Sequence, residues 1–375
     1  MRRSIQFMDR GRGERILVVQ TSYLGDIVLT TPLLNEIRRR FPEAELSILC
    51  TPQARSLLNA NADLYEIIED DKRGDGRGMK GLWRKAKELR SRGFTLAISP
   101  HKSLRSALLI FLARIPCRIG YRQSAGWFLY HHRVDRNAGC HDVERNLSIL
   151  KAFGVNPMEC RKDLHMEVEP AAREAVERLF ISLGIDRKEG RMFFGLNPGS
   201  AWPTKRWSAE GFAELIVQLN RRYPCEILLF GGPEDIEIVD RIQRSSGNLG
   251  VSLAGRIGLR ELACALNWCD VFITNDSGPM HIAVARDIPV VAIFCATTPA
   301  LGFYPYSSRA VVVEKALSCR PCSSHGGRRC PLGTEDCIRL IGVEDVLRGV
   351  ERLLNGKGQI GSAPEPSYIP DYITL

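Results

Sequence analysis

Short apolar runs alternate with amphipathic stretches along this chain, and that alternation predicts an α/β fold. In the first half, apolar runs that suit buried strands occupy 16–19, 45–50 and 95–99, and helical spacing covers 27–40 and 104–115. In the second half, strands are expected at 191–196, 226–230, 271–274 and 289–294, and helices begin near 208, 233 and 259. Strands that alternate with helices in this way are typical of parallel sheets.

The periodic pattern lapses near 156–170, and this lapse divides the chain into two halves. We expect an N-terminal domain at 14–165 and a C-terminal domain at 170–354, each built around its own sheet. Residues 355–375 are rich in Gly, Pro and Ser. That composition is typical of a flexible tail.

The segment 275–281 joins an expected strand to an expected helix. Backbone N–H groups at a helix start are unpaired and carry partial positive charge, so the place suits a phosphate group. Gly278 lets the backbone come close to a ligand, and Ser277 and His281 add side-chain donors. The alternative is an ordinary strand-to-helix turn with Asp276 or Ser277 as its N-cap.

Two further expected strands end in turns of the same kind. The strand 191–196 runs into a Gly/Ser turn that carries Lys205 and Arg206, and 226–230 runs into Gly-Gly followed by two acids, Glu234 and Asp235. Ligands collect at the carboxyl ends of strands in open α/β sheets. Cations there would meet the phosphates of a nucleotide diphosphate, and an acid would meet its ribose hydroxyls. The alternative for Lys205 and Arg206 is a solvated basic turn.

The first strand of the chain ends in a turn that contains Gly25 and Asp26. The carboxylate of Asp26 could serve only as a helix N-cap. It could instead act as a general base, because an alcohol acceptor must lose a proton to become a good nucleophile. Another strand, 95–99, leads to His101, which is a candidate contact for the same acceptor.

In their order and spacing these motifs resemble glycosyltransferase family 9, the lipopolysaccharide heptosyltransferases. The resemblance covers about residues 14 to 354, and the sequence of residues 20–26 is similar to that of the heptosyltransferase II branch. It rests on four motifs: Gly25-Asp26, the loop from Asn197 to Trp207, Gly231-Gly232, and the loop from Asp276 to His281.

The resemblance implies a GT-B fold, in which two Rossmann-like domains face each other across a cleft. It implies an inverting transfer of heptose from ADP-L-glycero-D-manno-heptose to Kdo or heptose on lipid A, with no bound metal and no cofactor. Asp26 would be the catalytic base, and the expected acceptor contacts are Ser22, Tyr23, Gly25 and His101. The expected donor contacts are Ser200, Lys205, Glu234, Asp276, Ser277, Gly278 and His281. Many relatives carry a basic residue where Gln20 stands, so one charge contact differs here.

The composition agrees with an enzyme of this kind. The 375 residues carry a formal net charge of +9, which favours anionic partners. No nucleic-acid-binding signature is present, so the expected partners are the ADP-heptose donor, the lipid A-linked acceptor and an anionic inner-membrane surface. No apolar run approaches the ~20 residues of a membrane span. The N-terminus lacks the apolar core of a signal peptide. The protein is therefore expected in the cytoplasm, with a peripheral position on the inner membrane as one possibility.

Four of the twelve cysteines cluster near the C-terminus, at Cys319, Cys322, Cys330 and Cys337. A Cys-x-x-Cys followed by two more cysteines can bind a structural zinc, although the spacing between the last two is longer than in a usual zinc ribbon. We expect no metal there, and structural zinc is the alternative. Tyr121 and Trp127 are expected to be packing residues.

Two other functions fit the same motifs. One is a sugar-nucleotide epimerase of GT-B architecture, and the other is a non-catalytic nucleotide-sugar-binding protein. The position of Asp26 favours transfer over mere binding.

Overall fold

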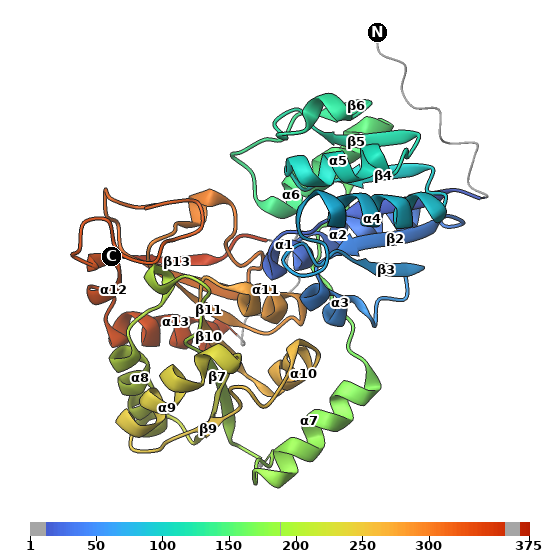
Figure 1. The fold of residues 1–375 in the computed structure, drawn as a ribbon. Coiled ribbons are helices and arrows are strands. Elements are labelled where there is room, and N and C mark those ends of the chain that lie inside the picture. Colours follow the sequence, from blue (N-terminus) through green and yellow to red (C-terminus); the bar gives the residue numbers. More distant parts are fainter. Residues whose placement is uncertain (1–12, 188, 357–367) are drawn as a thin grey trace. The chain divides into compact units, whose positions relative to one another are not determined.

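A computed structural model describes residues 13–187, 189–356 and 368–375 (Figure 1). The chain forms two compact units, Met1–Glu167 and Val168–Leu375. The division falls between the expected domain ends at 165 and 170. Both units are helix-covered parallel sheets, so the α/β prediction from the sequence is confirmed.

The first unit is built on a six-stranded sheet in the order β3-β2-β1-β4-β5-β6. Its strands are β1 (Arg15–Val19), β2 (Glu45–Cys50), β3 (Glu66–Glu69), β4 (Leu96–Ser99), β5 (Cys117–Tyr121) and β6 (His132–Val134). Val18 of β1 lies between Ile48 of β2 and Ile98 of β4, and the strand pairs are all parallel. The chain reverses its direction of winding between β1 and β4, which is the switch point of a Rossmann sheet.

Within residues 13–167, the α-helices that cover this sheet are α1 (Leu24–Val28), α2 (Thr31–Arg40), α3 (Pro52–Leu58), α4 (Gly78–Ser91), α5 (Leu104–Leu112) and α6 (Asp142–Leu147). The single helix expected at 27–40 is therefore wrong, because it is broken after Val28. Pro32 has no N–H to offer the carbonyl of Val28. The hydroxyl of Thr31 donates to that carbonyl instead, at 2.8 Å.

The second unit repeats the winding on a seven-stranded sheet in the order β13-β12-β11-β10-β7-β8-β9. Its strands are β7 (Met192–Asn197), β8 (Cys225–Leu229), β9 (Val251–Ser252), β10 (Val271–Asn275), β11 (Val290–Phe294), β12 (Ala310–Glu314) and β13 (Asp371–Thr374). Neighbouring strands are again parallel. The switch point now lies between β7 and β10.

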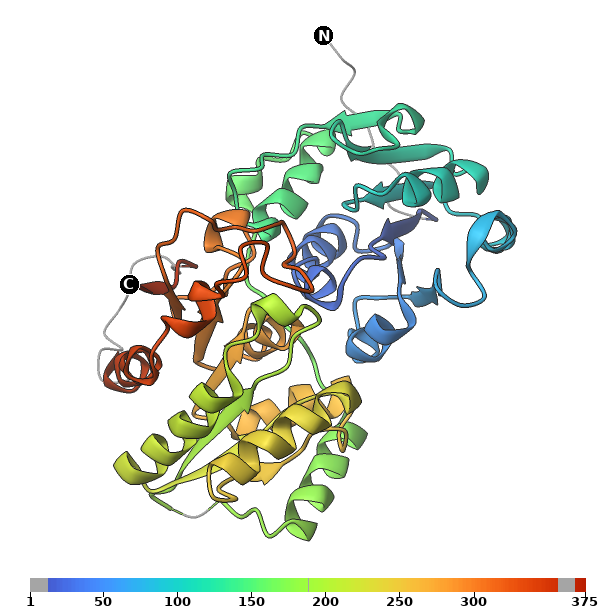
Figure 2. The ribbon, with the colours of Figure 1, turned by 60° about the vertical axis from the view of Figure 1, so that its left-hand side comes forward.

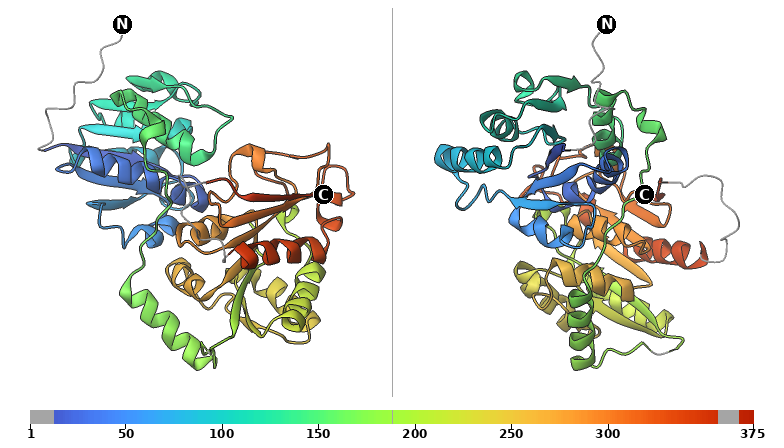
Figure 3. Two further views of the ribbon diagram at one scale, coloured as in Figure 1. Left: turned by 180° about the vertical axis from the view of Figure 1, so that it is seen from behind. Right: turned by 90° about the vertical axis from the view of Figure 1, so that its right-hand side faces the viewer.

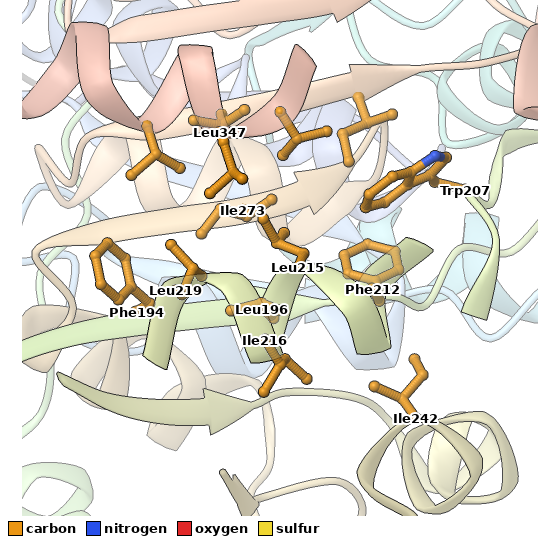
Figure 4. Packing of buried hydrophobic residues seen from close by; sticks show 14 of the residues in the cluster. Phe194, Leu196, Trp207, Phe212, Leu215, Ile216, Leu219, Ile242, Ile273 and Leu347 are labelled. Atoms are coloured by element: carbon orange, nitrogen blue, oxygen red, sulfur yellow. The ribbon is translucent and has the colours of Figure 1, made fainter. Parts of the chain in front are cut away.

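The helices of this unit are α7 (Pro170–Ser182), α8 (Ala209–Arg222), α9 (Ile236–Ser245), α10 (Leu259–Ala265), α11 (Gly278–Ala285), α12 (Asp336–Arg339) and α13 (Val343–Gly356). Helix α13 runs alongside β11 and β12, as Figure 3 shows, and α7 packs beside α10 (Figures 1 and 2). In Figure 4, Leu215 of α8 faces Ile273 of the sheet, and Leu347 of α13 lies on the other side of the same cluster. This core fixes the strand ends that carry the donor-site candidates.

The flexible tail expected at 355–375 is wrong at both of its described ends. Helix α13 continues to Gly356, and residues 371–374 form β13 beside β12. Val313 pairs with Ile373, whose side chain is buried in the core of the second unit. The segment 357–367 lies outside the described residues.

Candidate functional site

The loops that follow β7 and β10 are joined by an asparagine from each strand. The side-chain oxygen of Asn275 accepts from the backbone N–H of Trp207 at 2.9 Å, and its amide donates to the carbonyl of Pro198 at 2.8 Å. Across the switch point, Nδ2 of Asn197 donates to Oγ1 of Thr274 at 3.2 Å. The two segments expected to meet a phosphate are therefore held together as one surface.

Ser277 is the N-cap residue of α11, and Gly278 begins that helix. The hydroxyl of Ser277 lies 3.3 Å from that of Thr274, which Asn197 also contacts. The helix start is thereby fixed in place at the end of the sheet. Its first N–H groups are suited to an anion, as the sequence indicated.

Lys205 and Asp276, two of the expected donor contacts, form a salt bridge. Nζ of Lys205 lies 2.6 Å from Oδ2 of Asp276, and both side chains are largely buried. The hydroxyl of Thr297 donates to the same oxygen at 2.6 Å. Thr297 was not identified from the sequence, although it follows β11 just as the other candidates follow β7 and β10.

Ser200 is buried, and its carbonyl accepts two hydrogen bonds from Arg206, at 2.8 and 2.6 Å. Arg206 also lies 3.7 Å from Oδ1 of Asp235. A Cβ at Gly199 would stand 2.2 Å from Oδ2 of Asp235, so only glycine allows this approach. The loops after β7 and β8 are thus in contact.

The two acids after β8 differ in their surroundings. Asp235 is buried, burial raises the pKa of its carboxyl, and its Oδ1 has no hydrogen-bond partner in the described part of the chain. Glu234, the acid expected to contact the donor, is exposed. Asp235 is therefore the acid that packs against the loop of Ser200. Glu234 is exposed to solvent, where a ligand could reach it.

His281 is buried on α11. The charges of Asp276 and Lys205 both act on its imidazole. Burial lowers the pKa of its imidazole to about 4, and Lys205 adds to the effect while Asp276 opposes it. The ring is therefore neutral at pH 7. Within the described residues, its Nδ1 has no hydrogen-bond partner.

The cysteine-rich loop 319–337 packs on Lys205. Gly326 adopts a φ of +84°, and a Cβ there would lie 2.8 Å from Cγ of Lys205. Next to it, Gly327 and the hydroxyl of Thr204 exchange two hydrogen bonds, at 2.8 and 3.0 Å. The loop therefore packs against the aliphatic part of the lysine.

The cysteines of that loop are free thiols with different exposures. Cys319 is exposed, Cys322 and Cys330 are half-buried, and Cys337 is buried. Across residues 13–187, 189–356 and 368–375, no group of three or more His, Cys, Asp or Glu side chains is arranged to hold a metal ion.

In the first unit, Asp26 occupies the first turn of α1. Its Oδ2 accepts from the backbone N–H of Tyr23 at 3.1 Å, so one carboxylate oxygen does cap the helix. Burial and the nearby charge of Asp142 raise the pKa of Asp26 to about 6, against contacts with Ser22, Tyr23 and Arg136 that lower it. A carboxyl with that pKa is suited to proton transfer near neutral pH.

Asp142 opens α6 and lies in an ion-paired cluster. It contacts Arg136, and its Oδ1 lies 3.5 Å from Arg145. Asn146 connects this cluster to α1 and α2, since its amide donates to the carbonyl of Leu29 at 3.1 Å. Neither Asp142 nor its partners were identified from the sequence, because no strand-end or helix pattern brings them to Asp26.

His101 lies at the switch point of the first sheet. Its Nδ1 is 3.3 Å from the hydroxyl of Thr21 at the end of β1 and 3.0 Å from that of Ser106 on α5. Burial, with Lys72 and Lys102 nearby, lowers its pKa to about 4, so the ring is neutral. Lys72, which donates to the carbonyl of Thr21 at 2.5 Å, was another residue missed from the sequence.

The remaining acceptor candidates lie in the turn before α1. Ser22 donates to Oε1 of Gln20 at 2.8 Å, and Gln20 donates to the hydroxyl of Thr30 at 3.1 Å. Tyr23 is about half exposed, and Gly25 is half-buried in α1. The structure thus gathers the expected acceptor residues and Asp26 at one end of the first sheet, and the expected donor residues at the matching end of the second.

The chain as a whole is similar to known proteins. The family model described as glycosyltransferase family 9 (heptosyltransferase) matches residues 82–331. Lipopolysaccharide heptosyltransferase 2 of Salmonella typhimurium is 29% identical over 311 residues, covering 80% of this chain and 88% of its own. Lipopolysaccharide heptosyltransferase 3 of Escherichia coli is 26% identical over 343 residues, covering 88% and 96%.

Solved structures agree with the sequence matches. A glycosyl transferase family 9 protein from Veillonella parvula superposes with a TM-score of 0.79 at 27% identity, covering 92% of this chain and 98% of its own. The ADP-heptose lipopolysaccharide heptosyltransferase II of Escherichia coli has the same fold, with a TM-score of 0.72 at 24% identity over 92% and 99% of the two chains.

Proposed function

Because the chain belongs to glycosyltransferase family 9, the heptosyltransferases, we propose that it moves heptose from ADP-L-glycero-D-manno-heptose to the lipopolysaccharide inner core. The chain is thus a glycosyltransferase with a GT-B fold of two Rossmann-like units. The proposed acceptor is Kdo or heptose on lipid A. Support for this choice comes from relatives that are named as lipopolysaccharide heptosyltransferases and match most of their length.

The observation that carries the proposal is the site around Lys205. The buried ammonium group of Lys205 is one source of positive potential for a diphosphate, and the N-terminus of α11 is a second. The proposed donor contacts are Ser200, Lys205, Ser277 and Gly278, and Asp276 positions the lysine. His281, which is neutral, is the remaining proposed donor contact of the loop that begins at Asp276. Glu234 is exposed and available to the ribose.

The proposed acceptor contacts are Ser22, Tyr23, Gly25 and His101, and Asp26 is the proposed base. Support for that role comes from the pKa of about 6, which leaves the carboxylate ionised at pH 7 and still able to take a proton. Oδ2 of Asp26 is engaged by the N–H of Tyr23. We assign the acceptor hydroxyl to the other oxygen, Oδ1.

In the proposed reaction, Asp26 takes the proton of the acceptor hydroxyl as its oxygen forms a bond to the anomeric carbon of the donor. The bond between that carbon and the β-phosphate oxygen breaks, so ADP leaves with the electron pair and the configuration inverts. Lys205, Ser200 and the N-terminus of α11 stabilise the charge that develops on the diphosphate. The proposal needs no metal and no cofactor for this step.

The family and the named relatives favour transfer over the two alternatives, an epimerase and a non-catalytic sugar-nucleotide-binding protein. Among the described helices, none is both long and apolar enough to span a bilayer. We propose a cytoplasmic protein that meets a lipid A-linked acceptor at an anionic membrane surface.

The test is an assay of the purified protein with ADP-heptose and two acceptors, Kdo-linked lipid A and its heptosylated form. The proposal expects one acceptor to gain a heptose residue by mass spectrometry and ADP to appear in equal amount. Labelled donor incubated without acceptor should keep its configuration. Epimerised donor in that control, or ADP without a heavier acceptor, would contradict the proposal.

A further inference from the structure

One face of the first unit exposes large apolar side chains between arginines. It is formed by α5, the short 3₁₀ turn Trp127–Leu129, and the strands β5 and β6 at one edge of the sheet (Figure 1). Its exposed apolar side chains, with their exposed fractions, are Leu104 (41%), Phe111 (44%), Trp127 (47%) and Phe128 (57%). We call these four, with Arg118, His131 and Arg133, the aromatic–arginine patch.

The members of the patch are linked by direct contacts. The guanidinium of Arg118 lies 5.3 Å from the ring centre of Phe111, and it also donates to the carbonyl of Leu129 at 2.9 Å. The guanidinium of Arg133 lies 4.9 Å from the ring centre of Trp127, whose ring meets that of Phe128 edge to face at 6.1 Å. These contacts form two groups, Phe111 with Arg118 and Arg133 with Trp127 and Phe128, and Arg118 links the first group to the 3₁₀ turn through the carbonyl of Leu129.

The backbone brings the 3₁₀ turn down onto α5. A Cβ at Gly126 would stand 2.3 Å from Cβ of Ala107 and 3.4 Å from Cδ1 of Leu104. The absence of a side chain at Gly126 lets the turn sit against the helix, so Trp127 and Phe128 are held out on a rigid support. Large apolar rings are normally buried in the core, and monomeric proteins rarely expose several of them together.

The charge of the region is one-sided. From Leu89 to Val134 the sequence contains no Asp or Glu. Arg105 pairs with Asp70 and Arg122 with Asp135, both outside that stretch. Arg118 and Arg133 of the patch instead lie over aromatic rings. Such a surface attracts an anionic partner. Aromatic rings interleaved with arginines are typical of protein surfaces that lie at the boundary between lipid headgroups and acyl chains. Together, the two features fit an anionic bilayer better than a protein partner.

The patch also adjoins the proposed acceptor site. Lys102 follows His101, and its carbonyl accepts from the N–H of Ala125 at 3.1 Å, directly before the turn that carries Trp127. Leu104 begins α5 two residues later. The start of α5 therefore contributes both to the site of His101 and to the patch.

We propose that the aromatic–arginine patch seats the first unit on an anionic lipid bilayer, with Trp127 and Phe128 entering the headgroup region and Arg118 and Arg133 meeting lipid phosphates. The proposal rests on the proposed function in one respect, that the acceptor is linked to lipid. A patch that begins beside His101 places the acceptor residues next to the surface from which such an acceptor would come.

The test is co-sedimentation of the full chain with phosphatidylcholine vesicles that contain or lack phosphatidylglycerol. We expect binding only when phosphatidylglycerol is present. Removing both rings, in Trp127→Ser/Phe128→Ser, or reversing one charge, in Arg133→Glu, should weaken binding by about tenfold or more. Tyr65→Ser is the matched control, because Tyr65 is 64% exposed and lies beside β3 at the opposite edge of the sheet.

A second measurement does not depend on losing binding. Brominated lipids should quench part of the tryptophan fluorescence of the bound protein, and Trp127→Phe should keep binding but lose that part of the quenching. Full binding by the double variant and by Arg133→Glu would overturn the proposal. A second outcome would also overturn it. In that outcome, light scattering gives a lower mass for the double variant than for the wild type, which means that a second copy of the chain covers the patch, and vesicle binding is unchanged.

Failure of this proposal is distinguishable from failure of the proposed function. With a deacylated, water-soluble acceptor, the patch variants should transfer heptose at the wild-type rate, because Trp127, Phe128 and Arg133 are not among the proposed substrate contacts. Transfer without patch-dependent vesicle binding overturns the patch alone. Patch-dependent vesicle binding without any transfer overturns the function alone.

Discussion

Nζ of Lys205 lies 2.6 Å from Oδ2 of Asp276, so a residue that follows β7 and a residue that follows β10 meet across the switch point of the second sheet. The same carboxylate oxygen accepts the hydroxyl of Thr297, which follows β11. Three strand ends therefore fix one ammonium group in place before any ligand arrives. A positioned charge of this kind stabilises a diphosphate without the cost of ordering a flexible lysine.

Lys205→Ala should weaken ADP binding by about 1.5–3 kcal/mol, or roughly 10- to 150-fold, because a charged hydrogen bond to phosphate is lost. Calorimetric titration with ADP measures the effect. Arg241→Ala is the control, since Arg241 pairs with Glu210 on the exposed surface of the same unit. Unchanged ADP affinity in Lys205→Ala would remove the lysine from the site.

Gly326→Ala should also weaken ADP binding, although residue 326 is not expected to touch ADP. The new Cβ would stand 2.8 Å from Cγ of Lys205 and would push the side chain from its place. Gly333→Ala is a matched control in the same loop. It imposes the same kind of strain, with a φ of +72°, but its Cβ would meet nothing within 4 Å.

Backbone strain alone should cost each glycine variant about 1 kcal/mol of stability in thermal unfolding, and Gly326→Ala should lose more because its Cβ displaces Lys205. Only Gly326→Ala should lose ADP affinity, by several-fold or more. Equal ADP affinities in the two variants would show that the loop does not position Lys205.

The rate of transfer should fall as the pH drops below about 6, because Asp26 must be ionised to accept a proton. Asp142→Asn removes a negative charge that raises the pKa of Asp26 and frees Arg136, and both changes favour the carboxylate. The acid limb of kcat/KM should therefore move to lower pH, while remaining above the ordinary value of 3.8 because burial is the larger cause.

The control for this shift is Asp63→Asn, a change at a half-exposed residue of the same unit that should leave the limb in place. An acid limb that stays fixed or moves upward in Asp142→Asn would contradict the role of Asp142 in setting the pKa of Asp26.

Transfer should persist in excess chelator, because Lys205, Arg206 and the start of α11 supply the charge that a metal would otherwise supply to the leaving diphosphate. Metal analysis of the untreated protein is the control, since a chelator could remove a structural zinc from the cysteine-rich loop. Activity lost in chelator and restored by magnesium, in protein that held no zinc, would contradict the metal-free step.

The elements that could be predicted from sequence are those with long apolar runs. Six of the described strands were not predicted. Four of them, β3, β6, β9 and β13, are short strands at the sheet edges and are held mainly by pairing with a neighbour. Pairing of that kind depends on residues far away in the chain. The other two, β5 and β12, lie one place in from an edge, and the apolar run of β12 could have been recognised. Trp127 was expected to be a packing residue, and it is half exposed because Gly126 holds its turn against α5 from outside.

The candidate site shows the same division. Lys205 and Asp276 follow strong strands, so a local pattern was enough to find them, and the same rule applied to β11 would have found Thr297. Asp142 has no such signal, because it reaches the surroundings of Asp26 only through the packing of α6 against α2. Groups that tune a site from a neighbouring element are invisible to local patterns.

The proposed role of Asp26 is to activate an acceptor hydroxyl for attack on an ADP-linked heptose. The most direct measurement follows acceptor mass and anomeric configuration, by mass spectrometry and NMR, for the wild-type protein and Asp26→Asn side by side. The wild-type protein should add one heptose of inverted configuration. The rate should fall by about two to four decades in Asp26→Asn, while ADP affinity and thermal stability stay close to wild type. Near-normal transfer by Asp26→Asn would leave this residue as a helix cap and contradict the account.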